Sequence, residues 1–344
     1  MSWLNTKSSG KNARGTHSDL KLKSAPSLPS SRLNLALQGG GALGAFTWGV
    51  LHKLCERPEL QFKAISGASA GALNAAVFVS GYLNGGTEGA KEHLDAFWND
   101  ISSSATQSQL LLAPLNFGGD FNMLGAMFKA GVSMANSALN YNPLRQVIEN
   151  HVDFDALKYP TAPKLFVSAT NVMTADTRIF TNKEMSVDVL LASACLPSIH
   201  PTVWIDGAPY WDGGFTSNPP LMPLYNHRSD RTLLVRLIRA GAEEAPKRDA
   251  DIELYLKRLM FARPLRNDML RLSENPKQQL PDEINADDHE IEAKLTSSPT
   301  RRIVSDLFDK GQHAADAYLH DLSYNLRTSS KRTQTRTIRQ KANM

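Results

Sequence analysis

The stretch LNLALQGGGALG, residues 33–44, decides the expected fold. Its apolar start, Leu33 to Leu37, is typical of a buried strand, and the glycines that follow are typical of a tight loop. Apolar residues then recur at helical spacing from Phe46 to Leu54. The stretch therefore predicts a strand, a glycine loop and a helix in direct succession.

A second unit of the same kind follows. Residues 62–65 are apolar enough for a strand, GASAG at 67–71 predicts a turn, and the alanine-rich residues 72–79 predict a helix. Two consecutive strand–helix units indicate a parallel, doubly wound sheet, so we expect an α/β fold. Further strands are expected at 165–168, 178–180 and 233–235, and further helices at 187–194, at 252–272 with an interruption at Pro264, and at 301–322.

The remaining segments indicate one catalytic domain with short appendages. Residues 1–31 are rich in Ser, Lys and Pro, which predicts disorder, and the domain is expected at 32–325, followed by a basic flexible tail at 326–344. Residues 102–142 mix polar and bulky apolar side chains, a pattern that fits ordinary covering structure, which we favour, or a mobile apolar cap over an acyl-chain site. Residues 274–300 are expected to form an acidic loop.

Composition and charge narrow the functional class. The balance of 38 basic against 34 acidic residues is too even to indicate a nucleic-acid-binding protein. Cys55 and Cys195 both lie in apolar stretches, so we expect them in the core and in a reducing compartment. No apolar signal segment is evident at the start, and no stretch approaches the roughly 18 apolar residues of a membrane span. We expect a cytoplasmic protein with peripheral membrane association, and export without a classical signal peptide stays open.

Ser69 lies at the centre of a G-x-S-x-G motif, Gly67 to Gly71, between an expected strand and an expected helix. A sharp strand-to-helix turn holds a serine in a strained and exposed position, and its flanking residues are glycines because no side chain fits there. The placement predicts a nucleophilic serine. The alternative is a tight turn in which Ser69 caps the helix N-terminus.

The glycine loop, Gly39 to Gly41, has two interpretations. Bare backbone N–H groups at a helix N-terminus suit a developing oxyanion or a phosphate. Gly39, Gly41 and Gly44 also spell G-x-G-x-x-G, a dinucleotide fingerprint that requires an acidic residue about 20 residues further on. The chain has SGAS at 66–69 in that place, so the oxyanion interpretation is favoured.

Asp212 is the third candidate, after a turn-rich run at 205–211. Gly213 and Gly214 follow it, and a carboxylate on such a loop can accept a serine proton. Alone, Asp-Gly-Gly is a common turn, so it indicates a catalytic aspartate only together with the other two motifs. No cluster at metal-ligand spacing is evident in the sequence, and neither a metal nor another cofactor is expected.

Together these motifs resemble the patatin-like phospholipase family, over about residues 33–322. In that family a glycine-rich oxyanion loop ends a strand, a G-x-S-x-G elbow follows, and a distant D-G-[GA] supplies the aspartate of a Ser-Asp dyad. The blocks ASACLP at 192–197 and NPP at 218–220 are also similar to family blocks. The resemblance implies a three-layer α/β/α fold with a mainly parallel central sheet. It also implies an acyl hydrolase that acts on membrane phospholipid or another lipid ester.

The resemblance assigns roles to single residues. Ser69 corresponds to the nucleophile and Asp212 to its base. The implied oxyanion donors are Gly39, Gly40, Gly41 and Ala70. One departure is Leu43, where many family members carry Arg, Lys or His in the glycine loop, and this puts the head-group preference in doubt.

Two alternatives stay open. A Ser-Asp-His triad of the ordinary α/β-hydrolase type requires a histidine after the acid, and the candidates are His227, His289, His313 and His320. A non-catalytic lipid-binding or scaffolding protein would have kept the fold and lost activity, although all matched motif residues are intact. The sequence leaves open the lipid class, the acyl position, an activating partner and the oligomeric state.

Overall fold

The computed structural model of the 344-residue chain describes residues 31–103, 143–197, 200–241, 244–286 and 300–342. The expectations of disorder at 1–31 and of a cap or cover at 102–142 therefore fall almost entirely outside the described residues. Within the described residues, no helix combines the length and the apolar character needed to cross a membrane.

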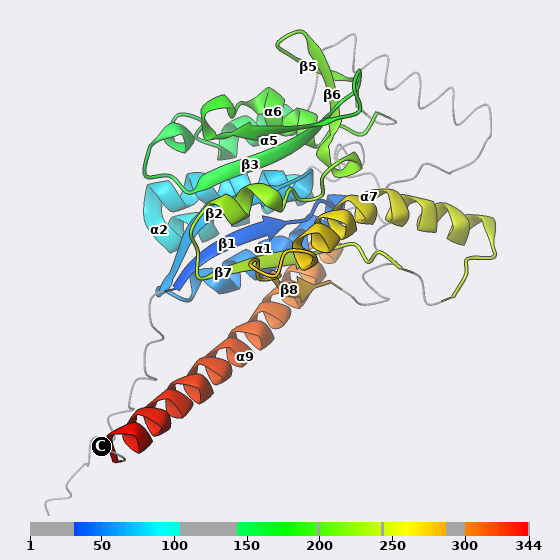
Figure 1. Ribbon diagram of the computed structural model, residues 1–344. Coiled ribbons are helices and arrows are strands. Elements are labelled where there is room, and N and C mark those ends of the chain that lie inside the picture. The colour runs from blue at the N-terminus through cyan, green and yellow to red at the C-terminus, as the bar shows by residue number, and fades with distance from the viewer. Residues whose placement is uncertain (1–30, 104–142, 198–199, 242–243, 287–299, 343–344) are drawn as a thin grey trace, which may run out of the picture.

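One eight-stranded sheet forms the centre of the domain (Figure 1). Its order is β5-β6-β3-β2-β1-β7-β8, with β4 also paired to β3. The strands from β3 to β8 along this path are parallel, whereas β4, β5 and β6 form antiparallel pairs at one side. The bounds are β1 Ser31–Leu37, β2 Leu60–Gly67, β3 Lys164–Asn171, β4 Thr177–Thr181, β5 Val203–Ile205, β6 Ala208–Asp212, β7 Arg231–Arg236 and β8 Asp282–Asn285.

Helices cover both faces of the sheet and give three layers (Figure 1). Side chains alternate along β1, so Leu33, Leu35 and Leu37 enter the larger core on the face of α1, α2 and α9. Ala36 points to the other face, where η5 and α7 enclose a smaller core. The expected α/β fold with a mainly parallel central sheet is confirmed. The helix bounds are α1 Gly44–Cys55, α2 Ala70–Ser103, α5 Pro143–His151, α6 Val187–Ser193, α7 Asp249–Ser273, α9 Arg301–Ala342 and the short η5 Met222–Asn226.

The pair formed by α1 and α9 closes the larger core. Gly49 of α1 and Gly311 of α9 let the two backbones approach, because a Cβ at either position would overlap the carbonyl of Phe308 or Phe46. The expected end of this last helix at 322 is wrong, since α9 continues to Ala342. The chain has no Gly or Pro between 323 and 342 to stop a helix.

Two short antiparallel strands replace most of the turn-rich run expected at 205–211. Strands β5 and β6 pair as a hairpin, and only Asp206 and Gly207 form the turn, with left-handed φ values of 51° and 79°. The hairpin brings the carboxyl end of β6, and with it Asp212, back to β3.

The C-terminal third also differs from expectation. Strand β8 lies within the segment expected to be an acidic loop, and it pairs in parallel with β7 at the edge of the sheet. Of its residues only Ile284 is buried, which leaves little apolar signal in the sequence. Helix α7 continues through Pro264, because Phe261 and Leu265 on either side are buried and hold it in place.

Candidate active site

The strand order brings Ser69 and Asp212 to one place. Strand β4 pairs with one edge of β3, and β2 and β6 share the other edge. The last residue of β2, Gly67, is opposite Val167, and the last residue of β6, Asp212, is opposite Ala169, two positions further along β3. The carboxyl ends of a parallel and an antiparallel strand therefore meet, and the loops that follow them are neighbours.

Ser69 occupies a strained turn between β2 and α2. Its φ is 52°, in the left-handed region that costs a residue with a Cβ about 1–2 kcal/mol. Its N–H donates to the hydroxyl of Ser193, which is fully buried, at 3.0 Å. A Cβ at Gly67 would lie 2.6 Å from the carbonyl of Gly71, and a Cβ at Gly71 would overlap the carbonyl of Leu37. The motif therefore needs both glycines, as the sequence predicts.

The geometry argues against Ser69 as a simple helix cap. A capping residue has extended φ and ψ, and its side chain accepts a hydrogen bond from the first turn. Ser69 has a positive φ, and no N–H of α2 donates to its hydroxyl among the described residues. The hydroxyl is therefore not used by the start of the helix.

The Asp212 carboxyl is buried at the end of β6, with 1% of the residue exposed. Its Oδ1 accepts the N–H of Gly214 at 2.7 Å. Its backbone is held on both sides, because the Asp212 N–H donates to the Cys195 carbonyl at 2.8 Å and the Thr170 hydroxyl donates to the Asp212 carbonyl at 2.7 Å. These bonds fix the position of the carboxyl independently of Ser69.

Burial raises the pKa of Asp212 to about 7, and the Gly214 N–H and the Ser69 hydroxyl lower it in part. The Ser69 hydroxyl thus acts on this carboxyl, whereas Oδ2 of Asp212 has no hydrogen bond of ordinary geometry with any described residue. The hydroxyl therefore lies near the carboxyl without a fully formed hydrogen bond to it. Such contacts often tighten only when substrate binds.

The glycine loop lies against the serine turn. A Cβ at Gly39 would be 2.8 Å from Cβ of Ser69 and 2.7 Å from the carbonyl oxygen of Ala68. Gly41 has a φ of 58°, and a Cβ there would meet nothing within 4 Å. The two strand–helix junctions are thus in contact, and the outer side of the loop is open.

The candidate oxyanion donors fall into two groups. The N–H of Gly39 donates to Oδ1 of Asn218 at 2.7 Å and is therefore already engaged. The N–H groups of Gly40, Gly41 and Ala70 donate to no group of the described residues. Three of the four predicted donors are available to a ligand.

Comparison with known proteins identifies the family. The family model described as patatin-like phospholipase matches residues 35–225, more than half of the 344-residue chain and a range that contains all three motifs. The chain belongs to the patatin-like phospholipase family. Membership of this family supports lipid hydrolysis as the class of activity. No curated protein sequence matches it.

Several solved structures are similar to this patatin-like chain at low identity. VipD from Legionella pneumophila is 14% identical over 85% of this chain and 68% of its own, with a TM-score of 0.38. The type III effector ExoU is 14% identical over 85% of this chain and 53% of its own, with a TM-score of 0.39. A complex of ExoU with SpcU from Pseudomonas aeruginosa gives 18% identity and a TM-score of 0.30, over 83% of this chain and 53% of that one. The chain thus spans about half the length of ExoU.

Leu43 differs from the basic residue of many patatin-like proteins. Its side chain is 1% exposed and belongs to the larger core. It packs among apolar residues and offers no group to a lipid head. Cys195, next to the Asp212 backbone, is also no rival nucleophile, because burial raises the pKa of its thiol to about 12.

Of the triad candidates, the described histidines His227, His313 and His320 have no hydrogen bond, ion pair or ring contact with Ser69 or Asp212. Within the part of the chain that the structure describes, no histidine shifts the pKa of Asp212. The ring of His227 contacts that of Phe166 at a tilted angle of 41°, with centroids 5.3 Å apart. His200, which precedes the aspartate in the chain, accepts the N–H of Leu196 at its Nδ1 atom at 3.3 Å. Both His313 and His320 are on α9, and His289 is outside the described residues.

Three positioning side chains were not predicted as site residues: Thr170, Ser193 and Asn218. Ser193 and Asn218 lie in the blocks ASACLP and NPP, whose similarity to the family is visible in the sequence without indicating what they contact. Their contacts become evident only when strands distant in the sequence pair.

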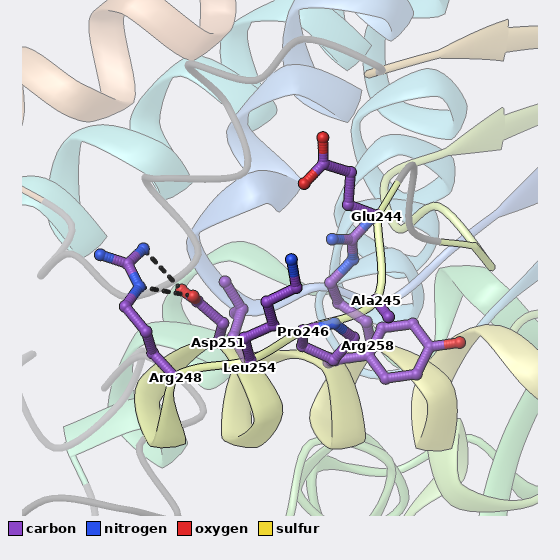
Figure 2. Close-up of a pocket in the computed structure, with 9 residues that line it drawn as sticks. Glu244, Ala245, Pro246, Arg248, Asp251, Leu254 and Arg258 are labelled. Carbon is purple, nitrogen blue, oxygen red and sulfur yellow. Dashed lines mark hydrogen bonds and ion pairs between the residues drawn. The ribbon is translucent and has the colours of Figure 1, made fainter.

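A cavity with a volume of about 400 Å³ lies elsewhere, between residues 244–248 and α7 (Figure 2). Figure 2 shows the guanidinium of Arg248 bonded to Asp251 beside this cavity. Nε of Arg248 donates to Oδ2 of Asp251 at 2.7 Å. Ser69 and Asp212 are not among its lining residues. The cavity is therefore separate from the candidate catalytic pair.

Proposed function

We propose that this patatin-like protein cleaves fatty-acyl ester bonds of lipids through a Ser69–Asp212 dyad and an acyl-enzyme. One observation carries the proposal. A strained serine and a buried carboxyl of raised pKa are adjacent where β2 and β6 converge, and no histidine of the described residues acts on the carboxyl. The substrates are phospholipids, lysophospholipids or related lipid esters, as family membership indicates.

The raised pKa explains how an aspartate can serve as the base. An ordinary aspartate, with a pKa of about 3.9, accepts a proton from a serine hydroxyl poorly. Asp212 has a pKa of about 7 because it is buried, so its ionised form is a stronger base and is still populated near neutral pH. The same burial keeps water from solvating the carboxylate.

The proposed reaction consists of two acyl transfers. As Oγ of Ser69 attacks the ester carbonyl, Asp212 accepts the hydroxyl proton, and it then returns that proton to the departing alcohol. The ionised Asp212 next takes a proton from water, whose oxygen attacks the acyl-enzyme. As the bond between the acyl carbon and Oγ of Ser69 breaks and the fatty acid leaves, Asp212 returns this proton to Oγ and restores the free serine. The open N–H groups of Gly40, Gly41 and Ala70 stabilise the oxyanion in both steps.

A lipidomic assay tests this function. The purified full chain is incubated with mixed membrane lipids, and the species that lose acyl chains are identified by mass spectrometry, with a Ser69→Ala variant as the matched control. We expect release of free fatty acid by the parent protein only. Equal release by both proteins, or none from any lipid class or from a p-nitrophenyl ester, would contradict the proposal.

Location and membrane contact follow from the same proposal. A lipid hydrolase acts at a lipid–water interface, and the sequence carries Lys331, Arg332, Arg336, Arg339 and Lys341 without an acid near its C-terminus. We propose peripheral association with anionic membranes through this basic end, since each cation near such a surface adds about 1 kcal/mol.

A further inference from the structure

We infer that Asn218 is a positioning residue that holds the glycine loop in the shape needed to bind an oxyanion. The inference rests on the proposed acyl-transfer function and adds a residue to it. Asn218 is fully buried, with 0% exposure, and it follows Asp212 by six positions in the sequence. One end of its side-chain amide accepts a hydrogen bond, and the other end donates one.

The Oδ1 atom of Asn218 accepts the N–H of Gly39 at 2.7 Å, and its Nδ2 atom donates to the Phe261 carbonyl of α7 at 3.0 Å. Only a carboxamide of this length provides an acceptor and a donor together at these two places. A carboxylate would accept the Gly39 N–H but would oppose the Phe261 carbonyl.

Fixing Gly39 determines where the next N–H groups point. Because the Gly39 amide is turned towards Asn218, the following peptide units of Gly40 and Gly41 are left facing elsewhere, without a partner among the described residues. Gly39 also contacts the serine turn, where a Cβ would be 2.8 Å from Cβ of Ser69. A small movement of Gly39 therefore changes the distance between the nucleophile and the candidate oxyanion donors.

Asn218 is itself held on a tethered segment. The Ser217 N–H donates to the Gly213 carbonyl at 2.8 Å, and the Ser168 hydroxyl of β3 donates to the Ser217 carbonyl at 2.8 Å. Phe261 closes the arrangement, because its ring lies 2.6 Å from the place of a Cβ at Gly214. One amide side chain thus links the glycine loop, the aspartate loop and α7.

The chain contains a matched control in Asn182. This asparagine is also buried, its Oδ1 accepts the N–H of Leu165 at 2.8 Å, and its Nδ2 donates to the carbonyls of Leu157 and Pro163 at 2.9 and 3.0 Å. It lies beside the start of β3, at the opposite end of that strand from Ala169 and Asp212. Its removal disturbs the fold in a similar way but leaves the glycine loop untouched.

The experiment compares Asn218→Ala with Asn182→Ala in the full chain. For each we measure the melting temperature, kcat and KM on a soluble p-nitrophenyl ester, and inhibition by a trifluoromethyl ketone, which forms a tetrahedral oxyanion on the serine. We expect both variants to melt at lower temperatures. Only Asn218→Ala should lower kcat by about 10²-fold, the effect of losing one oxyanion donor, with a similar loss of ketone affinity and little change in KM. An Asn218→Ser variant provides the same readouts if Asn218→Ala does not fold.

The controls separate this inference from the proposed function. The positioning role is wrong if Asn218→Ala hydrolyses the ester as fast as the parent protein and as fast as an Asn182→Ala protein of equal stability. The role would also be wrong if both variants lost kcat/KM in proportion to their loss of melting temperature. If the parent protein itself neither hydrolyses the ester nor binds the ketone, the dyad proposal fails first.

Discussion

The two strand–helix junctions at the centre of the sheet have the same place in the fold and different chemistry. β1 leads through Gly39–Gly41 into α1, and β2 leads through Ser69 into α2. Each junction has one residue with a left-handed φ, 58° at Gly41 and 52° at Ser69. The first is a glycine, which adopts this conformation without strain, and the second is a serine, for which it costs about 1–2 kcal/mol.

The difference shows where strain is retained. At the β1 junction the proposed contribution is made by backbone N–H groups, so no side chain is needed and glycine suffices. At the β2 junction a hydroxyl is required, so the strained residue stays and Ser193 satisfies its N–H. Each junction is also held by one buried polar side chain from a distant segment, Asn218 for the first and Ser193 for the second.

The largest expected effect comes from replacing Ser69 itself. Ser69→Ala and Ser69→Gly should both lower kcat by at least about 10³-fold, because either removes the nucleophile. The two should differ in stability, with Ser69→Gly more stable by about 1 kcal/mol since glycine relieves the left-handed strain. Urea unfolding measures this difference. A less stable glycine variant would show that the turn is not strained in the folded protein.

Asp212→Asn should also lower kcat strongly, by about 10³-fold, and should change how stability depends on pH. The folded-state pKa of Asp212 is about 7 against an ordinary 3.8, so the folded protein binds more protons within this window. Stability of the parent protein should therefore fall as pH rises from about 4 to about 7, by a few kcal/mol at most. Asp212→Asn should lack this fall, and above pH 7 it should be the more stable protein.

Melting temperatures between pH 4 and pH 8 test that difference. The outcome that contradicts it is a parallel pH dependence in both proteins. Such a result would mean that the Asp212 carboxyl ionises as freely in the folded chain as in the unfolded one, and the explanation of its basicity would then be wrong.

The damage caused by a substitution in the glycine loop should depend on which glycine is replaced. Gly39→Ala should be the more damaging, because its Cβ would lie 2.7 Å from the Ala68 carbonyl oxygen and 2.8 Å from Cβ of Ser69. Gly41→Ala meets no atom within 4 Å and should cost only the left-handed strain, about 1 kcal/mol. Gly41→Val should fold and yet lose activity, because a larger side chain blocks approach to the open N–H groups. Parent-level hydrolysis by a folded Gly41→Val protein would remove this loop from the proposed oxyanion site.

Removal of residues 328–344 should have the smallest effect. These residues carry five cations in the sequence, and the C-terminal end of α9 extends away from the sheet (Figure 1). We expect several-fold weaker binding to anionic vesicles at low salt, with no change on neutral vesicles and no change in kcat on a soluble ester. Vesicle sedimentation measures this. Equal binding of the truncated and full chains to anionic vesicles would exclude the role.

The sequence pattern predicts the glycine loop and the serine turn, because each is formed by residues close together in the chain. The strand, glycine loop and helix beginning at Leu33, and the turn around Ser69, follow from apolar periodicity and from the need for glycine. The adjacency of Asp212 to Ser69 depends on β6 pairing with β3 in line with β2, a long-range register that periodicity does not contain. The resemblance to a family indicated that Ser69 and Asp212 act together, and the residues alone did not.

The same limit explains the missed elements and contacts. β8 has one buried apolar residue, Ile284, so its strand character comes from pairing with β7. Gly39 was expected as an oxyanion donor beside Gly40, and only the fold reveals that Asn218 engages its N–H. A hydrogen bond between residues 179 positions apart leaves no spacing pattern in a sequence.

The central claim is that Ser69 is activated by Asp212 without a histidine, and covalent labelling tests it most directly. A fluorophosphonate probe is reacted with the parent chain, the modified residue is identified by peptide mass spectrometry, and the labelling rate is compared across Asp212→Asn and single substitutions of His200, His227, His289, His313 and His320. We predict labelling at Ser69, a rate that rises with pH as Asp212 ionises near pH 7, near-complete loss in Asp212→Asn, and a largely retained rate in every histidine variant. A folded histidine variant as unreactive as Asp212→Asn, or labelling at another residue, would contradict the account.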